Sequence, residues 1–278
     1  MDNFQLNKQL NIIKRRSNQL WRRLMDNSIT NYYNTYDEDG RLFRDYSHQI
    51  EWLTTMHYFG EIIPAYSKIF DGCAGTGNYA FKLAEQGHSV VASDIVPHNV
   101  DIMLKKQENT PILKDIFVGD ICACNHYSDN YFDVVLCMGA FYHLDEKKRY
   151  KAMEQCLRLL KNGGILVITY INLITILHMN LMSGLENINE ILKCYSMKSL
   201  GDSFVYMMPE EIETMAEKCK LKILHHITSD GNPLVRGANF NEAKKEDFEK
   251  YMELHLSLCE NKSFIGCGLH GLVFLTNI

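Results

Sequence analysis

Short apolar runs alternate with amphipathic stretches through the middle of the chain. The apolar runs lie at residues 68–70, 89–93, 116–118, 132–137 and 165–171. Between them, apolar positions recur at helical spacing, most clearly over residues 78–86, 100–107 and 146–160. Strands that alternate with helices predict a parallel, doubly wound α/β sheet, whose strands are apolar because helices cover both faces. Such sheets bind ligands beyond the carboxyl ends of their strands.

Both flanks of this alternation are expected to add helices. Residues 4–25 place apolar side chains at helical spacing among lysines and arginines, which predicts an amphipathic helix that packs on the domain or closes over its site. An anionic membrane surface or a transit peptide are the alternatives for this helix. We therefore divide the chain into a helical N-terminal extension or cap, residues 1–60, and a sheet domain, residues 61–278, with a helical, lid-like insertion at about 172–207.

The C-terminal part continues the alternation and brings the expected sheet to seven strands. A helix is predicted to begin just after Pro209, a residue that favours the first helical position. The pattern then predicts a strand, a second helix and a last strand, at 222–228, about 245–260 and 268–276.

Composition and charge exclude several classes of protein. The chain has 278 residues, is 46% hydrophobic and 23% charged, and carries a formal net charge of −5, which argues against nucleic acid as a partner. The apolar run at 165–182 approaches the length of about 18 residues that a membrane span needs. Asn172, His178 and Asn180 interrupt it, so we interpret it as a buried strand followed by a separate helix.

The cysteines indicate a reducing compartment. There are nine, an odd number, they are scattered, and none forms a Cys-x-x-Cys pair. This usage is typical of free thiols in the cytoplasm. Cys122, Cys124 and His126 fit no standard zinc spacing, so no metal is expected.

A glycine-rich turn follows the first apolar run, in the stretch Asp71-Gly72-Cys73-Ala74-Gly75-Thr76-Gly77-Asn78. Glycines leave no Cβ between main chain and ligand, and the helix that follows presents free N–H groups. The residues from Gly75 to Ala80 match G-x-G-x-x-A, the dinucleotide fingerprint, which leaves a nicotinamide-dependent oxidoreductase open. The carboxylate of Asp71 before the turn is poorly suited to a pyrophosphate and suits a ligand with an amino group. A further acid, Asp120, ends the third strand.

These residues carry a resemblance to class I S-adenosylmethionine-dependent methyltransferases. The glycine turn resembles their motif I, Asp94 matches the acid after the second strand, and Gly119-Asp120-Ile121 matches the adenine-side motif. Residues 133–144 resemble the fourth-strand motif, and 157–164 resemble "R-x-L-K-P-G-G", with Asn162 in place of proline. The resemblance covers roughly residues 65–171 and is greatest to the small-molecule branch around ubiquinone and menaquinone methyltransferases. It implies that residues 61–278 are a methyltransferase domain with a Rossmann-like fold.

The resemblance also implies a cofactor site. Gly75 and Gly77 would let the methionine part of S-adenosylmethionine approach the backbone, and Asp71 would help to hold its amino group, directly or through water. Asp94 would accept from both ribose hydroxyls, and Asp120 from the adenine amino group. The expected cofactor-binding residues are Asp71, Gly72, Gly75, Gly77, Asp94, Ile95, Asp120, Ile121, Cys137, Met138 and Tyr33.

The expected reaction is direct in-line methyl transfer to a small-molecule acceptor. His143 is the candidate general base because its reference pKa lies near neutrality, and Tyr142 beside it is expected to form an aromatic wall. Tyr33 and Tyr170 are further candidates for closing the pocket. Aromatic and Met-rich flanks suggest an apolar or aromatic acceptor. No Asn/Asp-Pro-Pro-Tyr motif follows the fourth strand, which disfavours methylation of nucleobase or glutamine amino groups. A non-catalytic cofactor-binding module is the remaining alternative.

Overall fold

The chain, seen in a computed structural model, divides after Tyr36, and its second unit, Asp37–Ile278, is compact. The structure describes residues 37–182, 184–200, 203–237 and 239–277. The predicted N-terminal helix at 4–25 and Tyr33 lie outside these residues. Residues 37–60, which the sequence pattern placed in the N-terminal extension, belong to the second unit.

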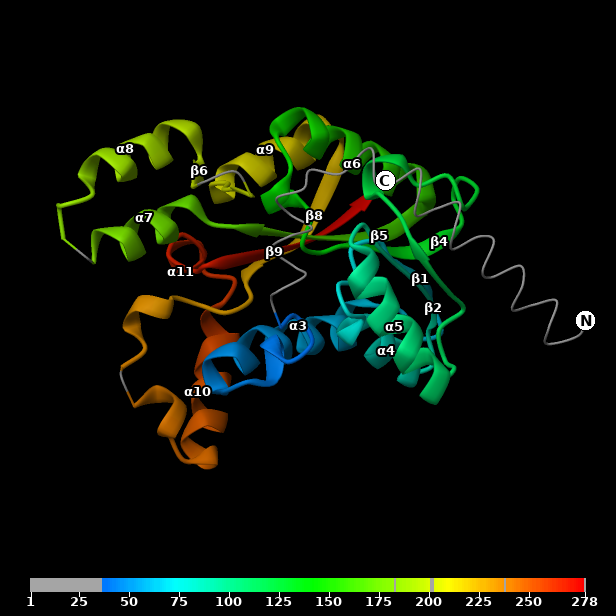
Figure 1. Ribbon diagram of the computed structural model, residues 1–278, viewed down its shortest axis with the longest axis horizontal. Coiled ribbons are helices and arrows are strands. Elements are labelled where there is room, and N and C mark those ends of the chain that lie inside the picture. Colours follow the sequence, from blue (N-terminus) through cyan, green and yellow to red (C-terminus); the bar gives the residue numbers. More distant parts are fainter. Residues whose placement is uncertain (1–36, 183, 201–202, 238, 278) are drawn as a thin grey trace, which may run out of the picture. The chain divides into compact units, whose positions relative to one another are not determined.

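One seven-stranded sheet organises the second unit, in the order β3-β2-β1-β4-β5-β9-β8 (Figure 1). The strands β1 to β5 pair in parallel, whereas β9 runs antiparallel to both β5 and β8. This arrangement confirms the predicted mostly parallel, Rossmann-like fold. The strands span Lys68–Asp71 (β1), Ser89–Asp94 (β2), Asp115–Val118 (β3), Phe132–Cys137 (β4), Leu160–Ile171 (β5), Leu221–Thr228 (β8) and His270–Asn277 (β9).

Helices cover both faces of the sheet, which explains the continuous apolar runs of the strands. In β1, Ile69 packs into a core shared with α3, α4 and α5, while Phe70, the next residue, packs into a core shared with α6 and α9. Both side chains are fully buried. These helices span Tyr46–Ile62 (α3), Asn78–Glu85 (α4), Pro97–Asn109 (α5), Glu146–Leu159 (α6) and Pro209–Lys218 (α9).

The segment after β5 contains the predicted helical insertion. Its elements are Leu173–Leu181 (α7), Ile188–Met197 (α8) and a two-stranded ladder of Ser199–Leu200 (β6) and Phe204–Val205 (β7). Asn172 anchors its start, because its side-chain amide donates to the carbonyls of Ile265, Gly266 and Gly268 at 3.0–3.1 Å. Across the described ranges, no helix is both long and apolar enough to cross a membrane.

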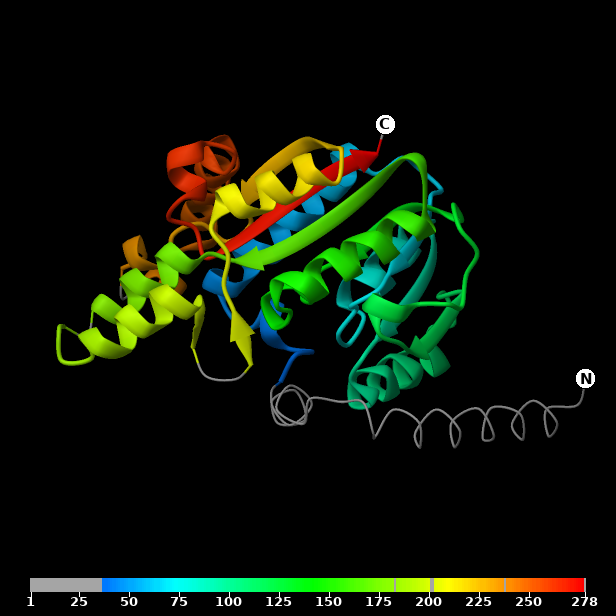
Figure 2. The same ribbon diagram turned by 90° about the horizontal axis from the view of Figure 1, so that it is seen from above.

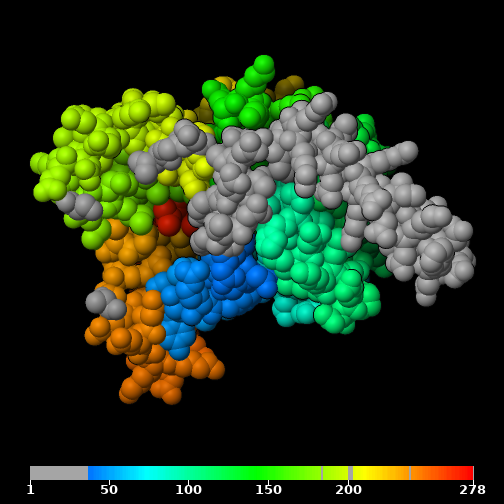
Figure 3. Space-filling model, in the orientation of Figure 1, coloured from blue at the N-terminus to red at the C-terminus, as the bar shows by residue number. Residues whose placement is uncertain are grey.

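The C-terminal strand β9 lies directly beside β5 (Figure 2), with Ile171 opposite His270. Because β9 runs antiparallel, its first residue stands at the sheet edge where β5 ends. The helices before it, Lys245–Leu258 (α10) and Lys262–Ile265 (α11), return the chain to this edge. In the space-filling view α10 lies against α3 (Figure 3), where Phe248 and Met252 pack on Ile50.

Replacing Gly271 with alanine is expected to destabilise the fold by about 3 kcal/mol, the upper part of the range for overpacked cores. A Cβ at Gly271 would lie 2.1 Å from Tyr170 Cε1. The tyrosine is fully buried and its Oη lies 2.9 Å from His226 Nε2, so it has little room to move. Urea denaturation would measure the loss. Gly60→Ala on α3, where a Cβ meets nothing within 4 Å, is the control and should be neutral or stabilising; equal behaviour of the two variants would contradict the packing argument.

Candidate cofactor and acceptor site

The glycine turn is fixed to the two strands beside β1. The Gly72 N–H donates to the Leu136 carbonyl, and the Ala74 N–H to the Ser93 carbonyl, each at 2.9 Å. Gly75 and Gly77 adopt φ angles of +55° and +86°, in the left-handed region that favours glycine. A Cβ at Gly72 would lie 2.5 Å from Ile121 Cδ1. The turn is therefore a rigid backbone surface at the carboxyl edge of the sheet.

Asp94 holds this turn from the end of β2. Its carboxylate accepts from the N–H groups of Gly75 and Val96, both at 2.8 Å, and from the Asn99 amide at 3.2 Å. Burial raises the pKa of Asp94 to about 6, although these three donors act in the opposite direction. A carboxylate has about four lone-pair positions, so one further donor fits without displacing an internal one. A second would replace Asn99, whose bond is the longest.

Asp71 lies beneath the same turn and is only 2% exposed. Burial, and then the charge of Asp94, raise the pKa of Asp71 to about 7, while the Cys73 N–H lowers it. Two carboxyl groups with raised pKa values thus flank one glycine turn. Such an edge favours a ligand that carries positive charge.

The other predicted cofactor residues also stand at strand ends, with different surroundings. Asp120 caps the short 3₁₀ helix Ile121–Ala123 by accepting from the Cys122 N–H at 2.8 Å, so part of its hydrogen-bonding capacity is used. Ile95 is exposed, whereas Cys137, Met138 and Ile121 are buried. Within the described part of the chain, no group of three or more metal-binding side chains could hold an ion.

Tyr142 and His143, the residues expected on the acceptor side, lie beside the segment that follows β5. The two rings lie 4.7 Å apart, and that of His143 lies 4.9 Å from Phe204. His143 Nδ1 is 2.6 Å from the Ser203 carbonyl oxygen. Since a carbonyl only accepts, Nδ1 carries the proton and Nε2 the lone pair of the neutral ring. Burial lowers the pKa of His143, and burial raises that of Tyr142.

The expectation that Tyr170 helps to close the pocket is wrong. It is fully buried in the sheet core, against Gly271, and bonds to His226. The side chain of a strand residue points to one face or the other, and that of Tyr170 points into the core beneath α9.

A segment before α3 contacts the glycine turn. The sequence pattern did not predict this contact. The Asp39 carboxylate accepts from the Thr76 hydroxyl at 2.8 Å and from the Lys106 ammonium group. Lys106 also donates to the Thr76 carbonyl and to the Asn78 side chain, at 3.1 and 3.0 Å. Lys106 on α5 thus joins the segment that contains Asp39 to the glycine turn.

A charged network continues from this segment to the C-terminal strands. Arg41 donates to Glu38 at 3.3 Å and makes a two-bond contact with Glu51, at 2.6 and 3.0 Å. Glu51 lies 3.9 Å from His270 Nδ1, which bonds to Asp230 at 2.8 Å. The sequence places His270 in the predicted last strand, but it carries no signal that this strand runs antiparallel beside β5.

The charges in this network alter each other's protonation. Burial opposes ionisation of Glu51, but Arg41 and His270 outweigh it and lower the pKa of Glu51 to about 2. Burial also opposes the charged form of His270, and Asp230 and Glu51 reverse this, so its pKa is raised. Glu38 differs, because burial raises its pKa and Arg41 compensates only in part.

The residues present fit S-adenosylmethionine. At Gly75 the turn presents backbone without a Cβ beside the Glu38 side chain, and Asp94 keeps capacity for a hydroxyl donor. Burial is the main cause that raises the pKa values of Asp71, Asp94 and Glu38. A nearby cation favours the charged form of a carboxyl group, and this cofactor carries both an ammonium and a sulfonium group.

Comparison with known proteins agrees with this geometry. Residues 70–168 match the family of methyltransferase domains, whereas no curated protein matches the sequence. A solved structure from Pyrococcus horikoshii OT3 is similar, at 14% identity over 87% of this chain and 100% of that one, with a TM-score of 0.56. A putative sarcosine dimethylglycine methyltransferase from Galdieria sulphuraria shares 17% identity over 82% and 84%, with a TM-score of 0.51.

A third similar structure is that of magnesium protoporphyrin IX methyltransferase from Synechocystis PCC 6803 with bound S-adenosylhomocysteine. It shares 10% identity over 84% of this chain and 83% of that one, with a TM-score of 0.51. At such identities the likeness shows a common fold. The match of residues 70–168 to the family of methyltransferase domains makes the chain an enzyme that carries such a domain, with S-adenosylmethionine as its cofactor.

Proposed function

We propose that the protein transfers the methyl group of S-adenosylmethionine to a small-molecule acceptor by direct in-line displacement. The observation that carries this proposal is the rigid glycine turn, held by Asp94, with an aromatic surface from the insertion at the same sheet edge. When bound, the cofactor supplies a methyl group already activated by its sulfonium. The chain's own task is therefore to hold the acceptor in line with that group and to exclude water.

The roles that we propose toward the cofactor are supported by the positions of the residues. Asp94 binds the ribose, Asp120 and Ile121 the adenine, and Gly72, Gly75 and Gly77 the methionine side, with Asp71 beneath them. Cys137, Met138 and Ile95 complete the surface at the strand ends. Support comes from the shared edge on which these residues stand, since Asp71 pairs with Ala92 and Leu136 across the neighbouring strands.

An apolar or aromatic acceptor is favoured by the side chains opposite the turn. Tyr142 packs with Ile171, Leu173 and Tyr206, which belong to the end of β5 and to the insertion. These surroundings suit a molecule with an aromatic or aliphatic body. A place in the ubiquinone and menaquinone branch stays a prediction, as does the cytoplasmic location, which the nine free cysteines favour.

His143 is the proposed general base for an acceptor that must lose a proton. Its Nδ1–H donates to the Ser203 carbonyl, which orients the ring and fixes its tautomer. Burial lowers its pKa and keeps the ring neutral, the form that accepts a proton. Tyr142 next to it forms the proposed aromatic wall.

Replacing His143 with glutamine is expected to lower the rate of methyl transfer about 100-fold, at the lower end of the range for general-base catalysis. Affinity for S-adenosylhomocysteine should change less than twofold. The wild-type rate should hold from pH 8 down to below pH 6.5 and fall only beneath that, because a lowered pKa keeps the base neutral. A rate that already falls above pH 7, or an unchanged H143Q rate, would exclude this role.

The proposed function is tested by calorimetry and by turnover. Titration with S-adenosylhomocysteine should show tight binding, and titration with NAD should show none. Release of S-adenosylhomocysteine is then measured over a panel of phenols, quinols, amines and carboxylic acids. Binding without turnover of any acceptor would favour the non-catalytic module, and binding of NAD alone would favour the oxidoreductase.

A further inference from the structure

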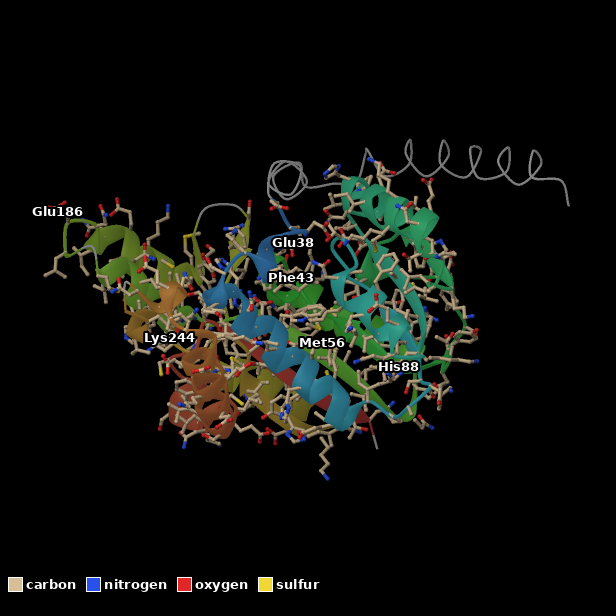
Figure 4. The ribbon with its side chains drawn as sticks, turned by 90° about the horizontal axis from the view of Figure 1, so that it is seen from below. Glu38, Phe43, Met56, His88, Glu186 and Lys244 are labelled. Carbon is tan, nitrogen blue, oxygen red and sulfur yellow. The ribbon has the colours of Figure 1, made fainter. Side chains whose placement is uncertain are left out.

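Glu38 and Arg41 place opposite charges side by side next to the glycine turn. A Cβ added at Gly75 would lie 3.4 Å from Glu38 Cγ and 3.9 Å from its Oε1. Figure 4 labels Glu38 near the start of α3, beside the loops at the strand ends. Arg41 Nε lies 3.3 Å from the same Oε1. Glu38 thus lies over Gly75, and the Arg41 guanidinium lies beside the Glu38 carboxylate.

Both groups are held in position by other residues. Asp39 ties the segment to Thr76 and Lys106 on one side of Glu38. The two-bond contact with Glu51 fixes the Arg41 guanidinium on the other side. Their side chains are only 21% and 19% exposed. A site fixed in this way binds a ligand without first ordering its own side chains.

Each group keeps unused hydrogen-bonding capacity. Arg41 has five N–H donors, of which its contacts with Glu38 and Glu51 use three, and among the described residues the other two have no partner. Glu38 Oε2 likewise has no donor among these residues. Burial raises the pKa of Glu38, and its charge contributes to the raised pKa of Asp94, so a cation at this place would relieve both groups.

We propose that Glu38 and Arg41 bind the α-ammonium and α-carboxylate groups of the cofactor's methionine part, with Glu38 on the ammonium and Arg41 on the carboxylate. The inference rests on the proposed function, since it needs the methionine part to lie on Gly75. It assigns the zwitterionic end to residues that precede the family match at residue 70. Asp71, only 2% exposed beneath the turn, then supports the ammonium from below.

Two nucleosides that differ only in this end provide the test. S-adenosylhomocysteine carries the α-amino acid group, whereas 5′-methylthioadenosine lacks it and keeps the adenine, the ribose and the sulfur. Calorimetry on the full chain would measure both affinities in wild type, Glu38→Gln and Arg41→Lys. Glu85→Gln on α4 and Arg44→Lys are the matched controls, because Glu85 and Arg44 are exposed.

Glu38→Gln is expected to weaken S-adenosylhomocysteine binding at least 10-fold and to change 5′-methylthioadenosine binding less than twofold. Arg41→Lys keeps the charge but loses the planar fork, so a 5- to 10-fold loss, again confined to S-adenosylhomocysteine, is expected. Both controls should bind like the wild type.

Two results would overturn the assignment alone, and a third would overturn the proposed function as well. If the Glu38→Gln variant bound S-adenosylhomocysteine with an affinity within twofold of the wild type, a contact between Glu38 and the ammonium group would be excluded. An equal loss for both nucleosides shows that the residues act through the structure of the turn alone. Wild-type protein that binds neither nucleoside contradicts the proposed function itself, and this inference with it.

Discussion

Asp94→Ala is expected to weaken S-adenosylhomocysteine binding at least 100-fold while the protein stays folded. The carboxylate is the shared acceptor for Gly75, Val96 and Asn99, so its removal leaves the turn without its lateral support. It also removes the acceptor proposed for the ribose. A hydrogen bond to a charged group contributes about 1.5–3 kcal/mol, and losing one ligand contact together with the fixed turn accounts for about 3 kcal/mol.

Calorimetric titration at pH 7.5 would measure this loss, with circular dichroism to verify the fold. Asp101→Ala is the matched control, because Asp101 is an exposed aspartate on the neighbouring helix α5. It should bind like the wild type. A tenfold or smaller loss in Asp94→Ala would mean that the ribose lies elsewhere.

Asp71→Asn is expected to make the ligand-free protein more stable, by about 2–4 kcal/mol at pH 7.5. The pKa of Asp71 is about 7 in the folded chain, mainly because of burial, against 3.8 for an ordinary aspartate. The folded state therefore holds this proton more tightly than the unfolded state does. The stability that this tighter proton binding contributes is fully present below about pH 4. It is lost as the pH rises to about 7, where the buried carboxyl group of Asp71 ionises. Asparagine stays neutral and avoids that loss.

Urea denaturation at pH 5, 6 and 7.5 would test whether the free energy of unfolding falls as the pH rises. The wild type should lose stability as pH rises over this range, and the variant should lose less, while its affinity for S-adenosylhomocysteine falls. Asp129→Asn, an exposed residue paired with Arg158, controls for a general change in charge. If Asp71→Asn were less stable than wild type at pH 7.5, the carboxylate would be stabilising and the argument from burial would fail.

The sheet and the acids at the ends of its strands were predictable because they depend on local sequence. Apolar runs mark strands that are covered on both faces, and the acids Asp71 and Asp94 stand where those runs end. Pro209 marked the start of α9 in the same way. Such signals lie within a few residues of the feature they predict.

The charged network was not predictable because it depends on long-range pairing. His270 reaches the cofactor edge only because β9 inserts antiparallel between β5 and β8. Glu38 and Arg41 precede the first strand by about 30 residues and read as an ordinary polar turn. The position of Asp120 was predictable, but its hydrogen bond from the Cys122 N–H was not. This bond uses the same carboxylate as the role predicted toward the adenine.

The charged network also determines which truncated or split versions of the enzyme keep all of its members. A fragment cut at the limits of the family match, residues 70–168, would keep the glycine turn and the three strand-end acids. It would lose Glu38, Arg41 and Glu51 at one end and Asp230 with His270 at the other. Circular permutants or split versions of this enzyme should therefore keep residues 37–62 and the β8–β9 pair together, since Glu51 on α3 and His270 on β9 lie 3.9 Å apart.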